Sequence, residues 1–576
     1  MPAPIAGVQR RNRKPPMSRL LTLHDPQTAR GYYEQGVWRD DTLYSLLREH
    51  ARVRPDAHAL RDSRRRLTWS QLAVWVDALA SELHAAGLKR GQRVSVWLPN
   101  RVEAAVVLLA CSRNGYVCNP SLHQNYTVAD IVQLLGRIQT AVLFAQPGYG
   151  ADADRVDVFA AAAAQPAMKR VYRLTPPGVE SAESGAHAKF PALGSASGAL
   201  PEPDLNPDKI TYLAFTSGTT GMPKGVLHSD NTLLANGRAM VRDWHHDDQT
   251  ILFSHSPLPH HIGTVALEQS LVAGFEVVVN DLPAGKKPLD WIVETGATYV
   301  MGVPTHAMDI LADMKSRGMQ KLGKVRIFYM AGSIIPPQTA KSFLDMGIKP
   351  QNIYGMTENG SHQYTLPDDD VEVITTTCGR ACHGYETRLW DQENPDIEAK
   401  PGELGEIGTR GALLTLGYFN NQSATENSFN ASGWFLSGDL GRLDAKGNLQ
   451  IVGRKKDLII RGGHNIYPAH IENLTVKHPA VLKAAAFPIA DERLGERVCL
   501  AIIARDGTRL DAAQMLDHLG EHGLSKYDMP EYFIAMDAFP QTASGKILKR
   551  ELVEMAKAGK IRPTAVRWTS PEKRKA

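Results

Sequence analysis

Short apolar segments that alternate with longer amphipathic ones constrain the fold of this chain more than any other feature. Five segments rich in Val, Ile, Leu, Met and Phe have the length and composition of buried strands: 94–98, 142–144, 250–253, 276–279 and 299–301. Helices are expected between them, including 101–111 and 305–315, and a helix that Ser70 caps is expected before the first strand, as far as about Ala86. Strands that alternate with helices predict an α/β fold with parallel-type sheets. From about Gly384 the pattern becomes β-rich, and a last α/β block runs to the end.

Composition and charge exclude several classes of protein. The 576 residues are 43% hydrophobic and 22% charged, which is typical of a folded globular protein and not of a disordered one. A net charge of +4 over this length is too weak to predict nucleic-acid binding. No apolar run approaches the length of a membrane span.

The cysteines and the N-terminal segment bear on the cellular compartment. Five cysteines, an odd number in a long chain, favour free thiols in a reducing compartment, so we expect a cytoplasmic protein. Residues 1–30 begin with a basic stretch that no apolar segment follows, which predicts a disordered tail and no secretory signal. Either Met1 or Met17 is then the natural start, and a transit peptide is a weaker alternative.

A glycine-rich segment at 216–226 has the composition of a phosphate-binding loop. It contains Thr216, Ser217, Gly218, Thr219, Thr220, Gly221 and Lys224. Glycines let the backbone approach a ligand, and successive N–H groups with hydroxyls and a lysine hold anionic oxygens. The segment lacks the G-x-x-x-x-G-K-S/T spacing of a Walker A loop. We expect it between a strand at 210–215 and a helix that Ser229 or Asp230 caps.

The letters T-S-G-T-T-G-x-P-K-G-V of this loop resemble the phosphate-loop signature of the adenylate-forming superfamily, which includes acyl-CoA synthetases, adenylation domains and luciferases. A second motif, Tyr354-Gly355-Met356-Thr357-Glu358, resembles the family's Y-G-x-T-E. The resemblance implies that Tyr354 and Gly355 flank adenine, with Met356 beside them. It further implies that Thr357 contacts phosphate and that Glu358 binds Mg²⁺, a cation that prefers carboxylate oxygens.

Other family motifs follow in order between about residues 40 and 555, and the resemblance assigns each a role. Gly332 and Ser333 are implied in nucleotide binding, His260 lies beside the substrate carboxylate, and Asp439 and Arg454 contact the ribose or a phosphate. Lys456 matches the hinge residue, and Gly462 and Gly463 match glycines that admit the pantetheine arm of coenzyme A. Lys546 matches a mobile lysine that bridges the carboxylate and the α-phosphate during adenylation, when charge develops in the transition state.

The resemblance also implies the domain organisation. After the tail, residues 31–453 form a large N-terminal AMP-binding domain with a β-rich subdomain. Residues 454–576 form a small, mobile α+β domain with a hinge near 454–457.

The implied activity is that of an AMP-forming carboxylate–CoA ligase, with ATP, Mg²⁺ and coenzyme A. The resemblance implies an alicyclic, aromatic or medium-chain acid. An amino acid substrate is disfavoured, because residues 256–263 contain no acidic side chain to hold an α-ammonium group. The near alternative is an aryl-acid adenylating enzyme that loads a carrier protein. A homodimer is compatible with the sequence. A dead nucleotide-binding protein disagrees with the presence of Lys224, Glu358, Asp439, Arg454 and Lys546.

Overall fold

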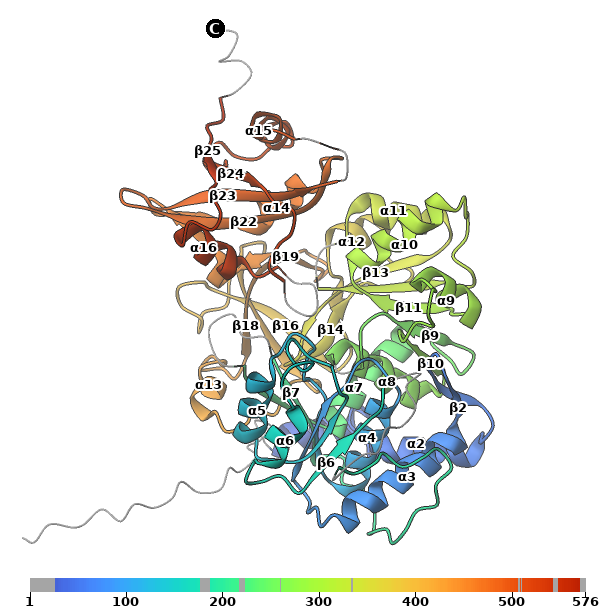
Figure 1. Cartoon of the computed structure of the whole chain (residues 1–576). Helices are drawn as coiled ribbons and strands as arrows, with labels where there is room; N and C mark the ends of the chain where they lie inside the picture. Colours follow the sequence, from blue (N-terminus) through green and yellow to red (C-terminus); the bar gives the residue numbers. More distant parts are fainter. Residues whose placement is uncertain are drawn as a thin grey trace, which may run out of the picture.

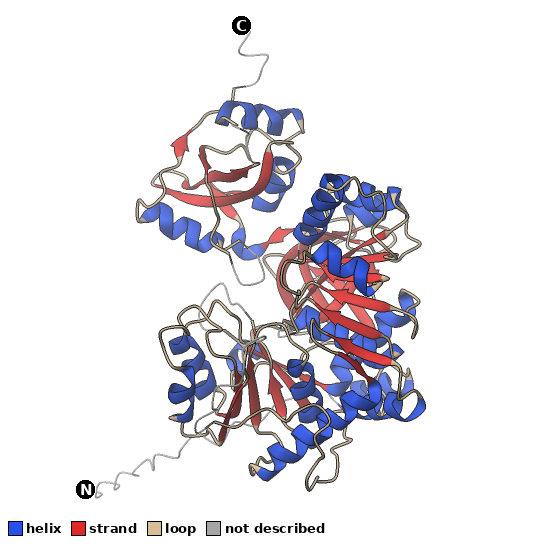
Figure 2. Cartoon of the chain, turned by 45° about the vertical axis from the view of Figure 1, so that its right-hand side comes forward, coloured by secondary structure: helices blue, strands red, loops and turns tan. Residues whose placement is uncertain are grey.

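The computed structural model describes residues 26–176, 187–216, 223–258, 260–332, 335–505, 508, 510–541 and 547–569. Two α/β sheets, a small antiparallel sheet and a separate C-terminal sheet make up the fold (Figures 1 and 2). The α/β class with a β-rich portion and a small C-terminal unit, predicted from the sequence, is confirmed.

The first sheet has six strands in the order β6-β5-β3-β4-β7-β8. Their bounds are β3 Arg93–Trp97, β4 Val117–Asn119, β5 Thr140–Ala145, β6 Arg170–Arg173, β7 Ile210–Phe215 and β8 Gly225–Ser229. All neighbours are parallel except β7 and β8, which form an antiparallel pair. Its central strands are buried on both faces, as continuous apolar runs require.

The second sheet has nine strands in the order β15-β14-β13-β12-β11-β9-β10-β1-β2. Their bounds are β1 His58–Arg61, β2 Arg66–Thr68, β9 Ile251–Ser254, β10 Glu276–Val279, β11 Tyr299–Gly302, β12 Ile327–Ala331, β13 Lys349–Met356, β14 Gly360–Tyr364 and β15 Arg380–Ala381. The six strands from β1 to β13 are mutually parallel, so the carboxyl ends of β9, β11, β12 and β13 meet at one edge. Such an edge is where α/β folds bind ligands.

The helices of this part cover the two sheets. Their bounds are α1 Pro26–Glu34, α2 Leu43–Val53, α3 Trp69–Ala85, α4 Glu103–Asn114, α5 Val128–Arg137, α6 Val158–Ala163, α7 Asp230–Asp243, α8 His261–Ala273, α9 Pro288–Thr295, α10 Pro304–Ser316, α11 Pro337–Asp345, α12 Val371–Thr376 and α13 Gln422–Glu426. One apolar core joins strands of both sheets to α3, α4, α7 and α8. The pair α7–α8 packs closely, because Gly237 faces the backbone of Glu268 with no room for a side chain.

The remaining strands form two further sheets. The small antiparallel sheet contains β16 Tyr385–Trp390, β17 Gly405–Gly411, β18 Phe435–Leu443 and β19 Leu449–Arg454. A 3-10 turn (Lys455–Asp457) leads to the C-terminal unit, which contains β20 Ile459–Arg461, β21 His464–Ile466, α14 Pro468–Thr475, β22 Val481–Asp491, β23 Gly495–Ala504, α15 Ala512–Glu521, β24 Tyr532–Ala535, α16 Lys549–Lys557 and β25 Thr564–Ala565. This unit has its own apolar core.

Two local predictions need correction. The loop at 216–226 does not lead directly into a helix, because β8 lies between it and α7, so the loop connects two antiparallel strands. The helix expected from Ser70 is capped by Thr68, whose hydroxyl accepts the Gln71 N–H while the Gln71 side chain binds the Thr68 N–H. Ser229 does cap α7, as expected.

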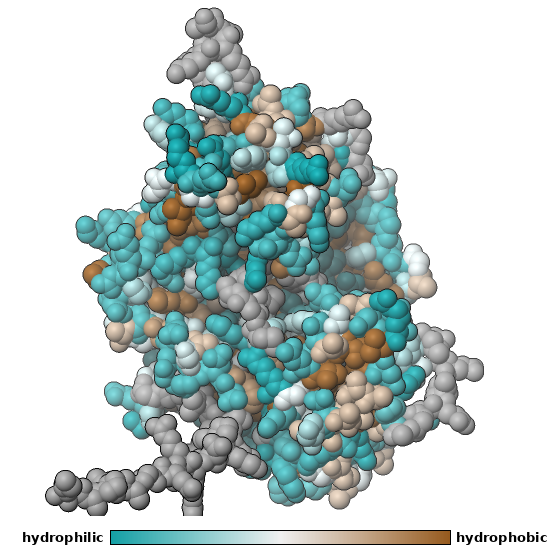
Figure 3. All heavy atoms as spheres, turned by 60° about the vertical axis from the view of Figure 1, so that its left-hand side comes forward, coloured by the Kyte–Doolittle hydropathy of each residue, from teal (hydrophilic) through white to brown (hydrophobic). Residues whose placement is uncertain are grey.

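The described surface and helices bear on the environment of the protein. No helix in the described ranges is both long and apolar enough to cross a membrane. The face drawn in Figure 3 is mostly hydrophilic, with hydrophobic residues in small separate groups. The five cysteines are free and buried, as expected for structural thiols.

Candidate active site

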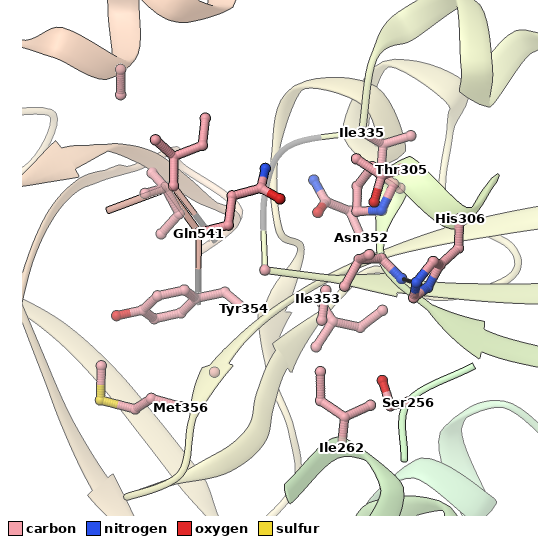
Figure 4. Close-up of a pocket in the computed structure, with 18 of the residues that line it drawn as sticks. Ser256, Ile262, Thr305, His306, Ile335, Asn352, Ile353, Tyr354, Met356 and Gln541 are labelled. Carbon is pink, nitrogen blue, oxygen red and sulfur yellow. Dashed lines mark hydrogen bonds between the residues drawn. The ribbon is translucent and has the colours of Figure 1, made fainter. Parts of the chain in front are cut away.

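A cleft of about 3810 Å³ opens at the carboxyl edge of the nine-stranded sheet and extends to the C-terminal unit. It is lined by these residues predicted from the sequence: Thr216, Lys224, His260, Gly332, Tyr354, Gly355, Met356, Thr357, Glu358, Asp439, Arg454 and Lys456. Figure 4 shows Tyr354, Met356 and Gln541 on one side of the cleft and Thr305 and His306 on the other. Segments more than 300 residues apart in sequence, such as those with Thr216 and Gln541, therefore meet in one cavity.

Some predicted residues are not among those that line the cleft. Gly462 and Gly463 lie in the turn between β20 and β21 and do not line it. Both have positive φ angles, +58° and +85°, which suit glycine. Ser217, Gly218, Thr219, Thr220, Gly221, Ser333 and Lys546 lie outside the described residues.

The glycine-rich segment 216–226, the phosphate-type loop, begins and ends on the paired strands β7 and β8. The Thr216 N–H donates to the Lys224 carbonyl oxygen at 2.9 Å, which closes the base of the loop. The Lys224 ammonium lies over the ring of Tyr418, 4.3 Å from its centroid. Burial lowers the pKa of Lys224, and the negative charge of Glu358 opposes this shift. The lysine is therefore a half-buried cation that points into the cleft.

Glu358 lies in the turn that follows β13 and is only 8% exposed. The Tyr418 hydroxyl donates to its Oε1 at 2.8 Å, and the Thr415 N–H donates to its backbone carbonyl at 2.7 Å. Burial raises the pKa of this carboxyl, while the Tyr418 hydrogen bond acts in the opposite direction. A buried carboxylate beside a phosphate-type loop suits a hard divalent cation, so the donor set fits Mg²⁺.

Tyr354, Gly355 and Met356 form the last residues of β13, not a loop after it. A methyl group at Gly355 would overlap the carbonyl oxygen of Gly360 on the neighbouring strand, so only glycine fits there. The Tyr354 hydroxyl donates to Asp439 Oδ2 at 2.8 Å. The tyrosine ring is thereby held at the edge of the cleft.

Asp439 and Arg454 are paired residues on the adjacent strands β18 and β19. Arg454 Nε lies 3.2 Å from Asp439 Oδ1, and Asp439 is 6% exposed. The Arg454 guanidinium compensates the charge of this buried carboxylate, which lines the cleft. Carboxylate oxygens each accept more than one hydrogen bond, so a carboxylate at this position is suited to two neighbouring hydroxyl groups.

His260 caps the N-terminus of α8 from the opposite wall of the cleft. Burial, assisted by the nearby His123 ring 5.9 Å away, lowers the pKa of His260 to about 4. The ring is therefore neutral at neutral pH. Its Nδ1 accepts the Ile262 N–H at 3.3 Å, which assigns the ring proton to Nε2. His260 is consequently a neutral hydrogen-bond donor.

Three residues of the site were missed by the sequence analysis. Tyr418 contacts both Lys224 and Glu358, His228 Nε2 lies 2.7 Å from the Thr357 carbonyl oxygen, and His123 faces His260. The only sequence signals were Tyr418 after Gly417 in a turn-rich segment and His228 just before a helix cap. Neither signal distinguishes a site residue from an ordinary buried one.

The 3-10 turn Lys455–Asp457 and the C-terminal unit complete the cleft. Lys455 Nζ forms an ion pair with Glu406 at 2.7 Å, and the neighbouring Lys456 lines the cleft. Gln541 and Ile547, which flank the undescribed segment 542–546, line it as well. In this arrangement Gln541 and Ile547 of the C-terminal unit face the cavity, whereas Gly462 and Gly463 do not line it.

Comparisons with known proteins agree with this geometry. The family model described as "AMP-binding enzyme" matches residues 47–419, and that of the "AMP-binding enzyme C-terminal domain" matches residues 470–546. The chain is 30% identical to the medium-chain fatty-acid–CoA ligase of Escherichia coli K12, over 92% of this chain and 93% of the relative. It is 28% identical to the 2,3-dihydroxybenzoate-AMP ligase of Bacillus subtilis, over 93% and 98% of the two chains.

A solved structure has the same architecture. ATP-bound MatB from Rhodopseudomonas palustris superposes with a TM-score of 0.77 at 27% identity, covering 90% of this chain and 99% of the other.

Proposed function

We propose that the substrate of this chain is a carboxylic acid with no second charged group. The chain belongs to the family of AMP-binding enzymes and is an AMP-forming acid–thiol ligase. ATP and coenzyme A are the co-substrates that a carboxylate–CoA ligase uses. The observation that carries the residue roles is the convergence of Lys224, Glu358, Asp439 and His260 on one cleft.

In the first half-reaction a carboxylate oxygen attacks the α-phosphorus of ATP, the bond to the bridging oxygen breaks, and pyrophosphate leaves. Tyr354 and Gly355 line the adenine site, Asp439 accepts hydrogen bonds from the ribose, and Lys224 with the 216–221 loop holds the departing phosphates. Glu358 would hold Mg²⁺, which supplies positive charge to the phosphate oxygens. The Nε2–H group of His260 donates a hydrogen bond to the substrate carboxylate, which stays ionised, and this bond orients it.

In the second half-reaction the thiol sulfur attacks the acyl carbonyl, the thiol proton is lost, and AMP leaves. The C-terminal unit presents the 541–547 side to the cleft, which is the arrangement expected for adenylation. Rotation at Lys456 would bring Gly462 and Gly463 to the thiol entrance instead. The domain boundary near residue 453 and this rotation are part of the proposal.

The acyl pocket is assigned by its apolar wall next to His260. Ile262 and Val265 on α8 and Ile353 on β13 contribute apolar side chains to the cleft lining. None of the described cleft-lining residues on α8, on β12 or at 303–306, where α10 begins, is Lys, Arg, Asp or Glu. A second charged group on the acid would therefore be buried without a partner. An alicyclic, aromatic or medium-chain monocarboxylate satisfies this wall.

Acid-dependent exchange of pyrophosphate into ATP tests the adenylation step. We expect pyrophosphate exchange with monocarboxylic acids of six or more carbons that carry no other charged group. Exchange with malonate or sulfoacetate, which carry two charged groups, should be at least tenfold lower. An equal response to the charged acids would contradict the assigned pocket. An absence of exchange with every acid would contradict the ligase roles themselves.

The roles of the two faces of the C-terminal unit are tested with Lys546→Ala. We expect it to lower acid-dependent exchange at least a hundredfold, because the cation that meets the transition-state charge is gone. Thioester formation from supplied acyl-adenylate and CoA should stay within about threefold of the wild type. Equal loss of both half-reactions would refute the assignment.

A carrier-protein acceptor is the second candidate, since one relative is named for acid adenylation without CoA. Incubation of the enzyme with acyl-adenylate and free CoA distinguishes the two acceptors. A CoA ligase consumes the free CoA, whereas an enzyme that loads a carrier protein does not. We also propose a cytoplasmic location; a homodimer is left to sedimentation measurements on the purified chain.

A further inference from the structure

Tyr418 lies between the two oppositely charged side chains of the ATP side of the cleft. Its hydroxyl donates to Glu358 Oε1 at 2.8 Å, and its ring carries the Lys224 ammonium on one face at 4.3 Å from the centroid. Tyr418 itself is 7% exposed and lines the cleft. Across the described residues, no ion pair within 4.0 Å joins Lys224 directly to Glu358.

Backbone hydrogen bonds fix the position of Tyr418 relative to both partners. The Phe419 N–H donates to the Gly225 carbonyl at 2.7 Å, one residue after Lys224. The Thr415 N–H donates to the Glu358 carbonyl at 2.7 Å, and the Tyr418 N–H donates to the Thr425 hydroxyl at 3.0 Å. The segment 415–419 thus ties the end of the phosphate-type loop to the turn with Glu358.

We propose that Tyr418 is a positioning residue that holds Lys224 and Glu358 apart and oriented for MgATP. The inference rests on the proposed function. The hydroxyl fixes one carboxylate oxygen, so the other remains directed to a cation. The ring face stabilises the ammonium without neutralising it. A direct ion pair between Lys224 and Glu358 would compensate both charges. This ion pair would then have to be broken before Lys224 could bind the phosphates and Glu358 the cation.

A purely structural role makes a different prediction from a positioning role. If Tyr418 only fills space, Tyr418→Phe keeps the ring and its packing and changes nothing at the ATP site. If the hydroxyl orients Glu358, Tyr418→Phe affects binding only when the cation is present. Tyr418→Leu additionally removes the ring face below Lys224, so it affects ATP binding with or without the cation.

The test is calorimetric titration of the full-length chain with ATP, once with Mg²⁺ and once with EDTA. We expect Tyr418→Phe to weaken MgATP binding about tenfold, as for loss of one hydrogen bond to a charged group, and to change binding in EDTA less than twofold. Tyr418→Leu should weaken binding in both buffers.

Tyr364→Phe is the matched control, because Tyr364 is also buried, its hydroxyl donates to the Asp243 carboxylate at 2.8 Å, and neither residue lines the cleft. Its affinity for MgATP should stay within twofold of the wild type. A Tyr418→Phe variant that binds MgATP like the wild type, or loses affinity equally in both buffers, would overturn the inference. A wild-type chain without MgATP affinity would overturn the proposed function and the inference with it.

Discussion

Protonation of His362 should make the large part of the molecule less stable in mild acid. His362 lies on β14 with no solvent exposure, and its ring packs against Tyr354 at 5.3 Å and Tyr385 at 4.8 Å. Burial lowers its pKa from 6.5 to about 3. Because the folded pKa is depressed, the unfolded chain binds more protons between pH 6.5 and pH 3, and stability falls as the pH falls through this window.

The magnitude follows from the two pKa values. Between pH 7 and pH 5 the unfolded histidine becomes protonated and the folded one does not, which costs about 2 kcal/mol at one pKa unit per 1.36 kcal/mol. Other buried groups titrate in the same range, so the readout is a difference. The stability gap between wild type and His362→Phe should shift by about 2 kcal/mol in favour of the variant from pH 7 to pH 5.

Urea unfolding followed by tryptophan fluorescence measures this difference. Eight of the nine tryptophans precede residue 454, so the signal reports mainly on the part that contains His362. His84→Gln, at an exposed helical position, is the control and should leave the pH dependence of the wild type unchanged. A gap that shifts by less than about 0.5 kcal/mol would refute the reasoning from burial.

Two further predictions concern binding. Asp439→Asn should raise the KM for ATP about ten- to a hundredfold, because the hydrogen bonds to a charged acceptor are weakened. The KM for the acid should stay within twofold of the wild type, and steady-state kinetics measure both values. A change confined to the KM for the acid would contradict the ribose assignment. Ile262→Lys should lower kcat/KM more than tenfold for an acid with no second charged group. In pyrophosphate exchange, the same variant should improve the relative rate with a dicarboxylate. An unchanged acid preference would show that Ile262 is not part of the acyl pocket.

Local patterns in the sequence predicted most of the fold and the residues that line the cleft. Apolar runs predicted strands such as β3 and β9, and the motif around Tyr354 supplied the edge of the cleft. β8 was missed because it is short, begins with glycine and follows a proline and a lysine, which together resemble the end of a loop. The capping position of α3 shifted to Thr68 because the same residue ends β2.

Contacts between distant segments explain the residues that sequence reasoning missed. Tyr418 reaches Glu358 across 60 positions, and His228 reaches the Thr357 carbonyl across 129. No periodicity or turn chemistry records such a pairing, because it depends on where the sheets bring the chain. The resemblance to a family named residues expected to contact ligands, and the structure adds the side chains that hold them.

Arg454 is the last residue of β19, and the 3-10 turn with Lys456 begins at the next position. The ion pair between Arg454 and Asp439 therefore joins the proposed ribose site to the connection between the two units. If a nucleotide at the proposed ribose site affects this pair differently in two orientations of the C-terminal unit, it also shifts the balance between those orientations. By thermodynamic reciprocity, the orientation of the C-terminal unit must then change the affinity for the nucleotide by the same factor.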